Sequence, residues 1–262
     1  MLLAHPLNRY IDHTLLKPDA TLKDFQKLID EAVQYNFASV CVSPFMAEPA
    51  VDVLKDYPDI KVCTVVGFPH GNIPFPLKVM ETEYFIERGV DEIDFVLNVG
   101  LLKSEMYENV GSEIEEIGRI CAKAGVVSKC IIETCFLTPE EKTFMYLALA
   151  DRTAVDFIKT STGFGSDGAN LRDILEWNAR RERADGTMRG NILFLNNMVS
   201  TYAARDGRPL LIKAAGGIRD LNTALEFIEC GANRLGLSAS VKVMEEWNAR
   251  NSQTFTGREE QA

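Results

Sequence analysis

Short apolar segments rich in β-branched residues recur along the chain, and each is followed by a segment whose apolar positions have helical spacing. Several of the short segments are apolar throughout, as expected for strands that are covered on both faces. This pattern predicts eight strands, at Tyr10–Leu15, Ala38–Ser43, Lys61–Gly67, Glu92–Asn98, Ser128–Glu133, Asp156–Thr160, Leu210–Ala214 and Arg234–Leu237.

The segments between these strands carry helix boundary signals. Thr138, Pro139 and Glu141 form a capping-box pattern, Thr21 precedes an amphipathic segment, and Asp220 precedes another. Alternation of strands and helices without a break in composition favours one parallel sheet, and eight such units suffice to close a barrel. We therefore expect an α/β fold, a single (β/α)8 TIM barrel formed by residues 1–262 as one domain.

Three segments depart from this repeat. Helical spacing over 171–183 and 192–205 predicts a helical insertion before strand seven, directed towards the bottom face and away from the chemistry. Residues 1–8 are expected to form an N-terminal extension, and the polar stretch 249–262 a flexible tail.

Composition narrows the class of protein. The formal net charge of −10 argues against a nucleic-acid partner, which would need a concentrated basic face. The six cysteines form no C-x-x-C pair and several lie in apolar runs, which favours reduced thiols in a cytoplasmic protein. The sequence has neither a signal-peptide pattern nor an apolar run long enough for a membrane span, so no membrane partner is expected.

Polar residues at the carboxyl ends of barrel strands are candidates for chemistry, because barrel active sites lie at that face. Lys159 and Lys213 end two apolar strands that are neighbours in the predicted sheet. A nucleophilic lysine must lose its proton, although its ordinary pKa is about 10.4. A second ammonium about 4 Å away opposes the charged form by on the order of 4 kcal/mol at an effective dielectric constant of 20. The pair therefore suits amine chemistry; alternatively, either lysine is structural and pairs with an anion.

Asp94 lies inside the fourth predicted strand. Strand alternation places it on one face with Glu92 and Val96, and places Ile93, Phe95 and Leu97 on the other. A buried aspartate needs a partner, and a lysine lining the barrel could provide it. Its role would be proton transfer and orientation of that lysine, and the alternative is a buried ion pair without chemistry.

Glycines in two loops predict a phosphate site. Gly216 and Gly217 follow the seventh strand, while Gly236 and Ser238 end the eighth just before a helix. Barrels often bind phosphate with backbone N–H groups at these loops, although glycine pairs are also common in ordinary turns. The histidines show no metal-binding spacing and no nucleotide-binding fingerprint occurs, so no metal and no cofactor are expected.

Segments in chain order resemble the deoxyribose-phosphate aldolase family of class I, TIM-barrel aldolases. They are Tyr10–Pro18, Gly67–Gly71, Asp91–Asp94, Asp156–Gly163 and Lys213–Arg219. The resemblance implies reversible cleavage of 2-deoxy-D-ribose 5-phosphate to D-glyceraldehyde 3-phosphate and acetaldehyde through a lysine Schiff base, without metal. The partners would be a small phosphorylated sugar and acetaldehyde, and we expect a homo-oligomer.

Site roles follow from matching positions in the resemblance. Lys159 would form the Schiff base, Lys213 would be the second lysine that favours loss of its proton, and Asp94 would assist proton relay. Residues that would surround the substrate are Gly163, Gly216, Gly217, Gly236 and Ser238 at the phosphate, and Asp12, Thr14 and Cys41 around the pocket. Read from the residues alone, Cys41 is better explained by packing.

The chain departs from the family pattern in two places. Phe164 stands where some members have a phosphate-facing lysine, and the tail 255–262 lacks the tyrosine with which some members end. Two other hypotheses stay open. The chain could be a class I aldolase with a ketose-phosphate donor, or a non-catalytic barrel that serves as a binding or scaffold protein.

Overall fold

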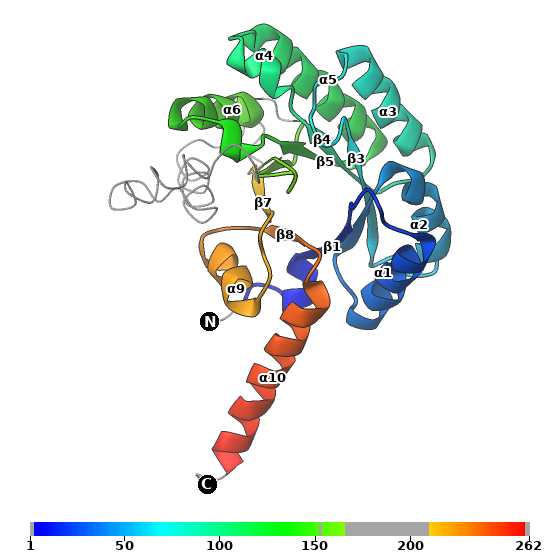
Figure 1. The fold of residues 1–262 in the computed structure, drawn as a ribbon, viewed down its shortest axis with the longest axis vertical. Coiled ribbons are helices and arrows are strands. Elements are labelled where there is room, and N and C mark those ends of the chain that lie inside the picture. Colours follow the sequence, from blue (N-terminus) through cyan, green and yellow to red (C-terminus); the bar gives the residue numbers. More distant parts are fainter. Residues whose placement is uncertain (1–2, 152–153, 166–209, 260–262) are drawn as a thin grey trace.

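The computed structural model describes residues 3–151, 154–165 and 210–259. Within them the chain forms a closed barrel of eight parallel strands, in which each strand pairs with the next and the last pairs with the first (Figure 1). The strands are β1 (Ile11–Leu15), β2 (Ser39–Val42), β3 (Lys61–Val66), β4 (Glu92–Val96), β5 (Val127–Ile131), β6 (Phe157–Lys159), β7 (Leu211–Ala215) and β8 (Arg234–Leu237). The predicted barrel is confirmed, and every predicted strand overlaps an observed one.

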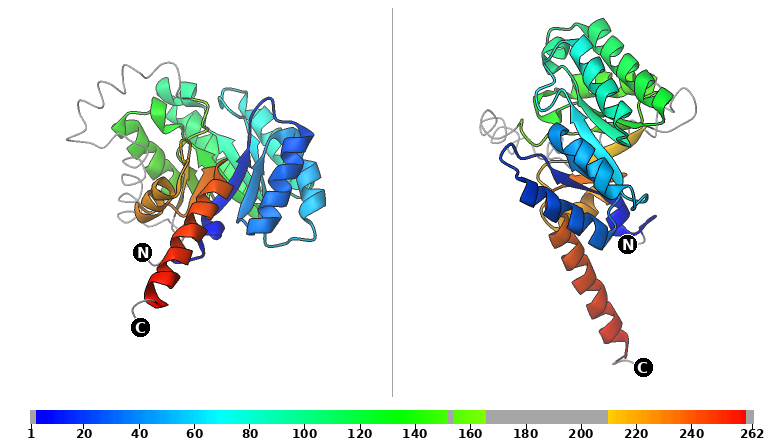
Figure 2. Two further views of the ribbon diagram at one scale, coloured as in Figure 1. Left: turned by 60° about the horizontal axis from the view of Figure 1, so that its bottom comes forward. Right: turned by 90° about the vertical axis from the view of Figure 1, so that its right-hand side faces the viewer.

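Helices lie around the barrel (Figure 2), and they connect successive strands except between β6 and β7, where residues 166–209 are not described. They are α1 (Leu22–Tyr35), α2 (Ala47–Leu54), α3 (Phe75–Glu87), α4 (Val99–Lys103), α5 (Tyr107–Ala124), α6 (Pro139–Asp151), α9 (Leu221–Glu229) and α10 (Ser240–Glu259), with short 3-10 turns η1 (Leu7–Tyr10), η2 (Pro44–Met46) and η3 (Thr134–Phe136).

The predicted helix starts are occupied by capping side chains. Thr21 forms a capping box at the start of α1. Thr138 and Glu141 exchange hydrogen bonds in the same way at α6, where Thr138 N donates to Glu141 Oε2 at 2.8 Å and Glu141 N donates to Thr138 Oγ1 at 3.2 Å. Asp220 accepts from the backbone N of Thr223 at α9. Local sequence therefore fixes where these helices begin.

The carboxyl-terminal helix is longer than the sequence predicts. We expected the polar chain to fray after Asn248, but α10 continues to Glu259 and projects away from the barrel (Figures 1 and 2). The flexibility of this tail stays a prediction. The predicted insertion helices at 171–183 and 192–205 lie outside the described residues. Among the residues that are described, no helix combines the length and apolar character needed to cross a membrane.

Side chains alternate on each strand between two environments. On β4, Ile93 and Phe95 belong to the main apolar core, which lies between the strands and the helices. Glu92 and Asp94 instead form ion pairs with residues of other strands, inside the barrel. The interior thus holds buried ionic groups where barrels usually pack branched aliphatic side chains. This alternation positions the candidate site.

Gly71, in the loop after β3, occupies a space that only glycine fits. Its φ is +67°, and a Cβ there would lie 2.0 Å from the carbonyl oxygen of Leu97, just after β4. Gly71→Ala should therefore carry a cost of about 1–2 kcal/mol for the left-handed conformation, and about 1–3 kcal/mol more for overpacking. Urea denaturation measures the lost free energy of unfolding.

Gly125 provides a matched control for this prediction. Its φ is +71°, but nothing lies within 4 Å of a Cβ built there. Gly125→Ala should therefore lose only the conformational contribution. Equal losses in the two variants would contradict the close approach of the two loops that follow β3 and β4.

Candidate active site

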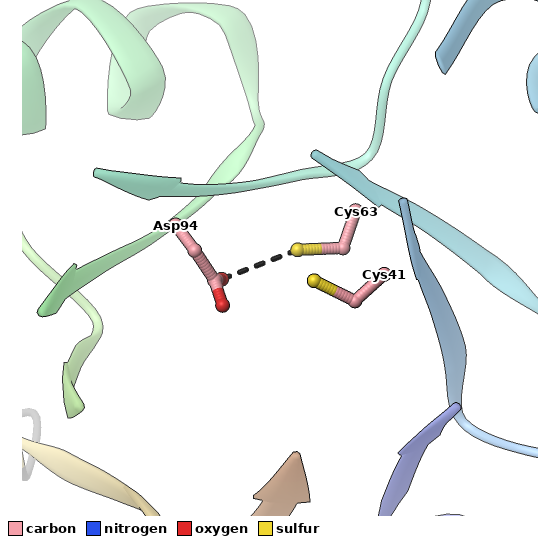
Figure 3. A group of neighbouring side chains, drawn as sticks. All are labelled: Cys41, Cys63 and Asp94. Carbon is pink, nitrogen blue, oxygen red and sulfur yellow. Dashed lines mark hydrogen bonds between the residues drawn. The ribbon is translucent and has the colours of Figure 1, made fainter. Parts of the chain in front are cut away.

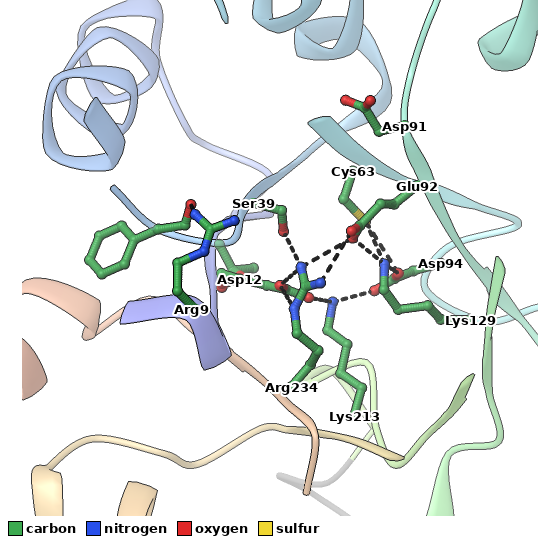
Figure 4. Close-up of polar contacts among 12 residues, drawn as sticks. Arg9, Asp12, Ser39, Cys63, Asp91, Glu92, Asp94, Lys129, Lys213 and Arg234 are labelled. Atoms are coloured by element: carbon green, nitrogen blue, oxygen red, sulfur yellow. Dashed lines mark hydrogen bonds and ion pairs between the residues drawn. The ribbon is translucent and has the colours of Figure 1, made fainter. Parts of the chain in front are cut away.

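Asp94 contacts three lysines of a buried ionic cluster inside the barrel, and Figure 4 labels two of them, Lys129 and Lys213. Its Oδ2 atom lies 2.7 Å from Lys159 Nζ and 2.7 Å from Lys213 Nζ. Its Oδ1 atom lies 2.8 Å from Lys129 Nζ. None of these four side chains is more than 4% exposed. The sheet register contributes directly, because it pairs Asp94 with Lys129 and Lys159 with Lys213 on adjacent strands.

A second carboxylate and a guanidinium extend the cluster towards β1 and β8. Asp12 Oδ2 lies 2.6 Å from Lys213 Nζ. Arg234 contacts Asp12 and also lies 3.2 Å from Glu92. Glu92 in turn pairs with Lys129 at 2.7 Å. Figure 4 shows these charged side chains meeting in the barrel interior from several strands.

The pKa shifts follow from this arrangement. Burial by itself would raise the pKa of the Asp94 carboxyl, but the surrounding ammonium groups, first that of Lys129, outweigh burial and hold this pKa well below its usual value. Burial would lower the pKa of Lys213, but Asp12 and Asp94 outweigh it and raise this pKa above its usual value. The pKa of Lys129 is raised in the same way, against burial, chiefly by Asp94. Lys213 is therefore a persistent cation that shares a carboxylate oxygen with Lys159.

One group of side chains in the described part of the chain could jointly ligate a metal ion. The ligand atoms of Cys41, Cys63 and Asp94 lie within 4.8 Å of one another, and Cys63 Sγ lies 3.2 Å from Asp94 Oδ1 (Figure 3). Asp94 already binds several ammonium groups, so a divalent cation at this place would meet strong repulsion. The two thiols instead belong to a small apolar cluster on which Leu16 and Phe68 pack.

Asp12, Thr14 and Cys41 lie together on neighbouring strands, as the resemblance implies. Thr14 is in register with Cys41, and its hydroxyl donates to the backbone oxygen of Asp12 at 2.8 Å. Asp12 and Cys41 are buried, whereas Thr14 is partly exposed. These residues line the interior next to the lysine cluster.

The predicted phosphate residues fall on three neighbouring chain segments. Gly163 and Gly216 follow β6 and β7 with φ values of +86° and +91°. A Cβ on Gly216 would lie 3.9 Å from the Cα of Gly163, so the two loops are adjacent. Gly217 also has positive φ, at +76°, and Ser238 is exposed just before α10 begins. Glycine loops next to the N-terminus of a helix are the kind of backbone whose N–H groups bind phosphate in barrels.

Gly236 has an additional structural reason to lack a side chain. It lies within β8, and a Cβ built there would be 3.1 Å from Lys213 Cε and 3.2 Å from Ala215 Cβ. Glycine at 236 was expected to allow the approach of a phosphate, and it also leaves room for the side chain of Lys213.

Lys129 and Arg234 belong to the cluster but were not expected there from the sequence. Lys129 carries the same signal as Asp94, a charged residue inside an apolar strand, although it does not end its strand as Lys159 does. Arg234 opens β8 and reads as a surface residue, although it joins Asp12 to Glu92. Of the two, Lys129 was recognisable from the sequence, because a charged residue inside an apolar strand needs a partner.

The fold and the buried lysine–carboxylate cluster are those of a (β/α)8-barrel enzyme. Residues 8–240 match the model of the DeoC/LacD family aldolases, and the chain belongs to that family. It is an aldolase, and therefore a lyase. The family resemblance read from the sequence motifs is confirmed.

Named relatives are similar over nearly their whole length. The chain is 42% identical over 238 residues to the deoxyribose-phosphate aldolase of Thermococcus kodakarensis, covering 90% of this chain and 95% of that protein. It is 42% identical over 241 residues to the enzyme of the same name from Thermoanaerobacter sp. strain X514, covering 92% and 96%. A solved deoxyribose phosphate aldolase from Aeropyrum pernix, described as a unique tetramer, superposes with a TM-score of 0.76 at 28% identity, covering 92% and 91%.

Asp94→Asn tests the cluster through stability. It removes a negative charge that several ammonium groups surround, and breaking a buried ion pair costs about 3–5 kcal/mol of unfolding free energy. Because the pKa of Asp94 is lowered in the folded protein, its contribution is present above the unfolded value of about 3.9 and is lost as the pH falls below it. The variant should be less stable at pH 7 and should lose less stability on acidification.

Denaturant unfolding at neutral and acidic pH measures both effects. Asp52→Asn, at an exposed position of α2, is the matched control and should keep the wild-type pH dependence. If Asp94→Asn keeps the wild-type slope towards acid, the carboxylate is not held charged by its neighbours.

Proposed function

We propose that the chain reversibly cleaves 2-deoxy-D-ribose 5-phosphate to D-glyceraldehyde 3-phosphate and acetaldehyde through a Schiff base on Lys159. The observation that carries the proposal is the shared oxygen of Asp94, which lies 2.7 Å from Lys159 Nζ and 2.7 Å from Lys213 Nζ. The relatives named deoxyribose-phosphate aldolase support the choice of substrate.

Charge balance supports Lys159 as the nucleophile. Among the described residues, Lys213 pairs with two carboxylates and Lys129 pairs with two, whereas Lys159 pairs with Asp94 alone. The negative charges of the cluster are matched without Lys159; they are those of Asp12, Glu92 and Asp94, opposite Lys129, Lys213 and Arg234. Release of a proton from Lys159 therefore removes an excess positive charge from a buried site.

In the proposed reaction, the neutral Nζ of Lys159 attacks the C1 aldehyde of the open-chain sugar, and loss of water gives a protonated imine. When the C3 hydroxyl loses its proton, the C2–C3 bond breaks and its electron pair moves into the imine. This step leaves glyceraldehyde 3-phosphate and an enamine. Protonation of the enamine at C2, followed by hydrolysis, releases acetaldehyde and the free lysine.

The other residues of the site receive roles from their positions. Asp94, with Lys213, would move protons through water next to the imine. The loops that carry Gly163, Gly216 and Gly217 would hold the phosphate, together with Ser238 just before α10. The imine is itself the electron sink, so this chemistry requires no metal or cofactor.

The substrate class, the cellular location and the oligomeric state are also part of the proposal. The substrate is a small phosphorylated sugar, and the reaction fits a cytoplasmic enzyme of deoxyribonucleotide catabolism. The Aeropyrum pernix relative is described as tetrameric, which supports a homo-oligomer here.

Turnover of deoxyribose 5-phosphate by Lys159→Leu tests the mechanism. Loss of a covalent nucleophile should reduce kcat roughly 10⁴-fold or more, while the fold is retained. Lys123→Leu, at an exposed position near the end of α5, should keep wild-type turnover. Activity that survives in Lys159→Leu would reject the Schiff base on this lysine.

The nature of the donor is tested separately. Borohydride reduction in the presence of acetaldehyde should leave an ethyl group on the protein, detectable by mass spectrometry. Trapping of dihydroxyacetone phosphate instead would favour a ketose-phosphate aldolase. Absence of both adducts and of turnover would favour a binding protein.

A further inference from the structure

We propose that Glu133 is a positioning residue that holds the loop after Lys159 in the conformation that receives the substrate's phosphate. This inference rests on the proposed function, since it concerns the phosphate of the same substrate. Glu133 lies two residues after the end of β5, the strand next to β6, and no role was expected for it from the sequence.

The side chain of Glu133 is directed at the loop after β6. Glu133 is 4% exposed and has a φ of +50°, which turns the chain sharply after β5. Its carboxylate accepts the backbone N–H of Thr162, with N–O distances of 3.2 and 3.3 Å, and also accepts the Thr162 hydroxyl. The Thr162 hydroxyl in turn accepts the backbone N–H of Phe164 at 3.0 Å. One carboxylate therefore orders the residues on both sides of Gly163.

The loop is held at its other end by β7. The Thr160 hydroxyl donates to Ala215 O at 3.2 Å and accepts from Ala215 N at 3.1 Å. The backbone N of Thr134 donates to Thr160 O at 2.9 Å. Gly163 thus follows the Thr160 anchor and lies between Thr162 and Phe164, and Gly216 lies next to it. The Thr160 anchor fixes the loop to β7, and the Glu133 anchor fixes it to β5.

Packing indicates that the loop rests directly on Glu133. A Cβ built on Gly165 would lie 2.9 Å from Glu133 Cδ and 3.2 Å from Cys135 Sγ. Glycine at 165 therefore allows the chain to pass over the side chain of Glu133 at contact distance. This close approach is a second, independent sign that the loop and the carboxylate form one unit.

Glu133 is unsuited to bind phosphate itself, because both groups are anions. Its effect would be to order the loop before the substrate arrives, so that binding does not have to fix the backbone around Gly163. The consequence should appear in binding of the phosphate rather than in amine chemistry at Lys159. For a sugar without phosphate, kcat and KM should depend little on Glu133.

The experiment compares kcat and KM for 2-deoxyribose 5-phosphate and for 2-deoxyribose in matched variants. Glu133→Gln and Thr162→Val each remove part of the anchor, and each should raise KM for the phosphorylated sugar about tenfold, the effect of one lost charge-assisted hydrogen bond. For 2-deoxyribose the change should stay within about twofold. Thr162→Ser keeps the hydroxyl and should restore most of the wild-type KM.

Glu140→Gln is the control for the loss of a carboxylate, because Glu140 is exposed in the first turn of α6. It should match the wild-type protein on both substrates. Equal losses on the two substrates in Glu133→Gln and Thr162→Val would overturn the inference, as would an unchanged KM. If Glu133→Gln does not fold, the comparison of Thr162→Val with Thr162→Ser decides.

Inorganic phosphate separates this inference from the proposed function. Calorimetric titration should show weaker phosphate binding to Thr162→Val than to Thr162→Ser, whether or not the sugar is turned over. If the wild-type protein does not cleave the sugar phosphate, the proposed function fails, and the phosphate titration still tests the loop. Equal phosphate affinity in the two variants would contradict the role of the Glu133 anchor.

Discussion

The site depends on the contact of one carboxylate oxygen of Asp94 with two lysines. Two ammonium groups, those of Lys159 and Lys213, lie at hydrogen-bond distance from one oxygen inside a closed barrel. One carboxylate cannot neutralise two buried cations, so further charges are needed to stabilise the arrangement. Asp12 supplies a second anion to Lys213, which leaves Lys159 as the less firmly paired amine.

Closure of the barrel brings together the residues of this cluster, which are far apart in the sequence. Arg234 and Asp12 are 222 residues apart in the sequence, yet they touch because β8 pairs with β1. Parallel register then places Asp94 level with Lys129, which it helps to neutralise, and Lys159 level with Lys213, two cations that both contact Asp94. The same order of strands brings the loops after β5, β6 and β7 together, and in the proposed reaction the loops after β6 and β7 hold the phosphate.

The site residues that could be predicted from the sequence are those that interrupt an apolar strand with a charge. Asp94 and Lys213 stand out as charges in apolar strands, and the barrel itself follows from the alternation of elements. Lys129 carried that signal and was overlooked. The role of Glu133 was beyond sequence reasoning, because it depends on a left-handed turn and on a loop from another strand. Gly236 shows a different limit, since one glycine can satisfy both packing against Lys213 and the approach of an anion.

The claim that Lys159 is the reactive amine is tested most directly by asking which buried lysine forms an imine. The protein would be incubated near neutral pH with acetaldehyde and cyanoborohydride, digested, and mapped by mass spectrometry. Lys129 and Lys213 serve as internal controls for Lys159, because all three lysines contact the same carboxylate. We predict that, of the three, only Lys159 carries the ethyl group. An ethyl group on Lys129 or Lys213, with Lys159 unmodified, would contradict the account.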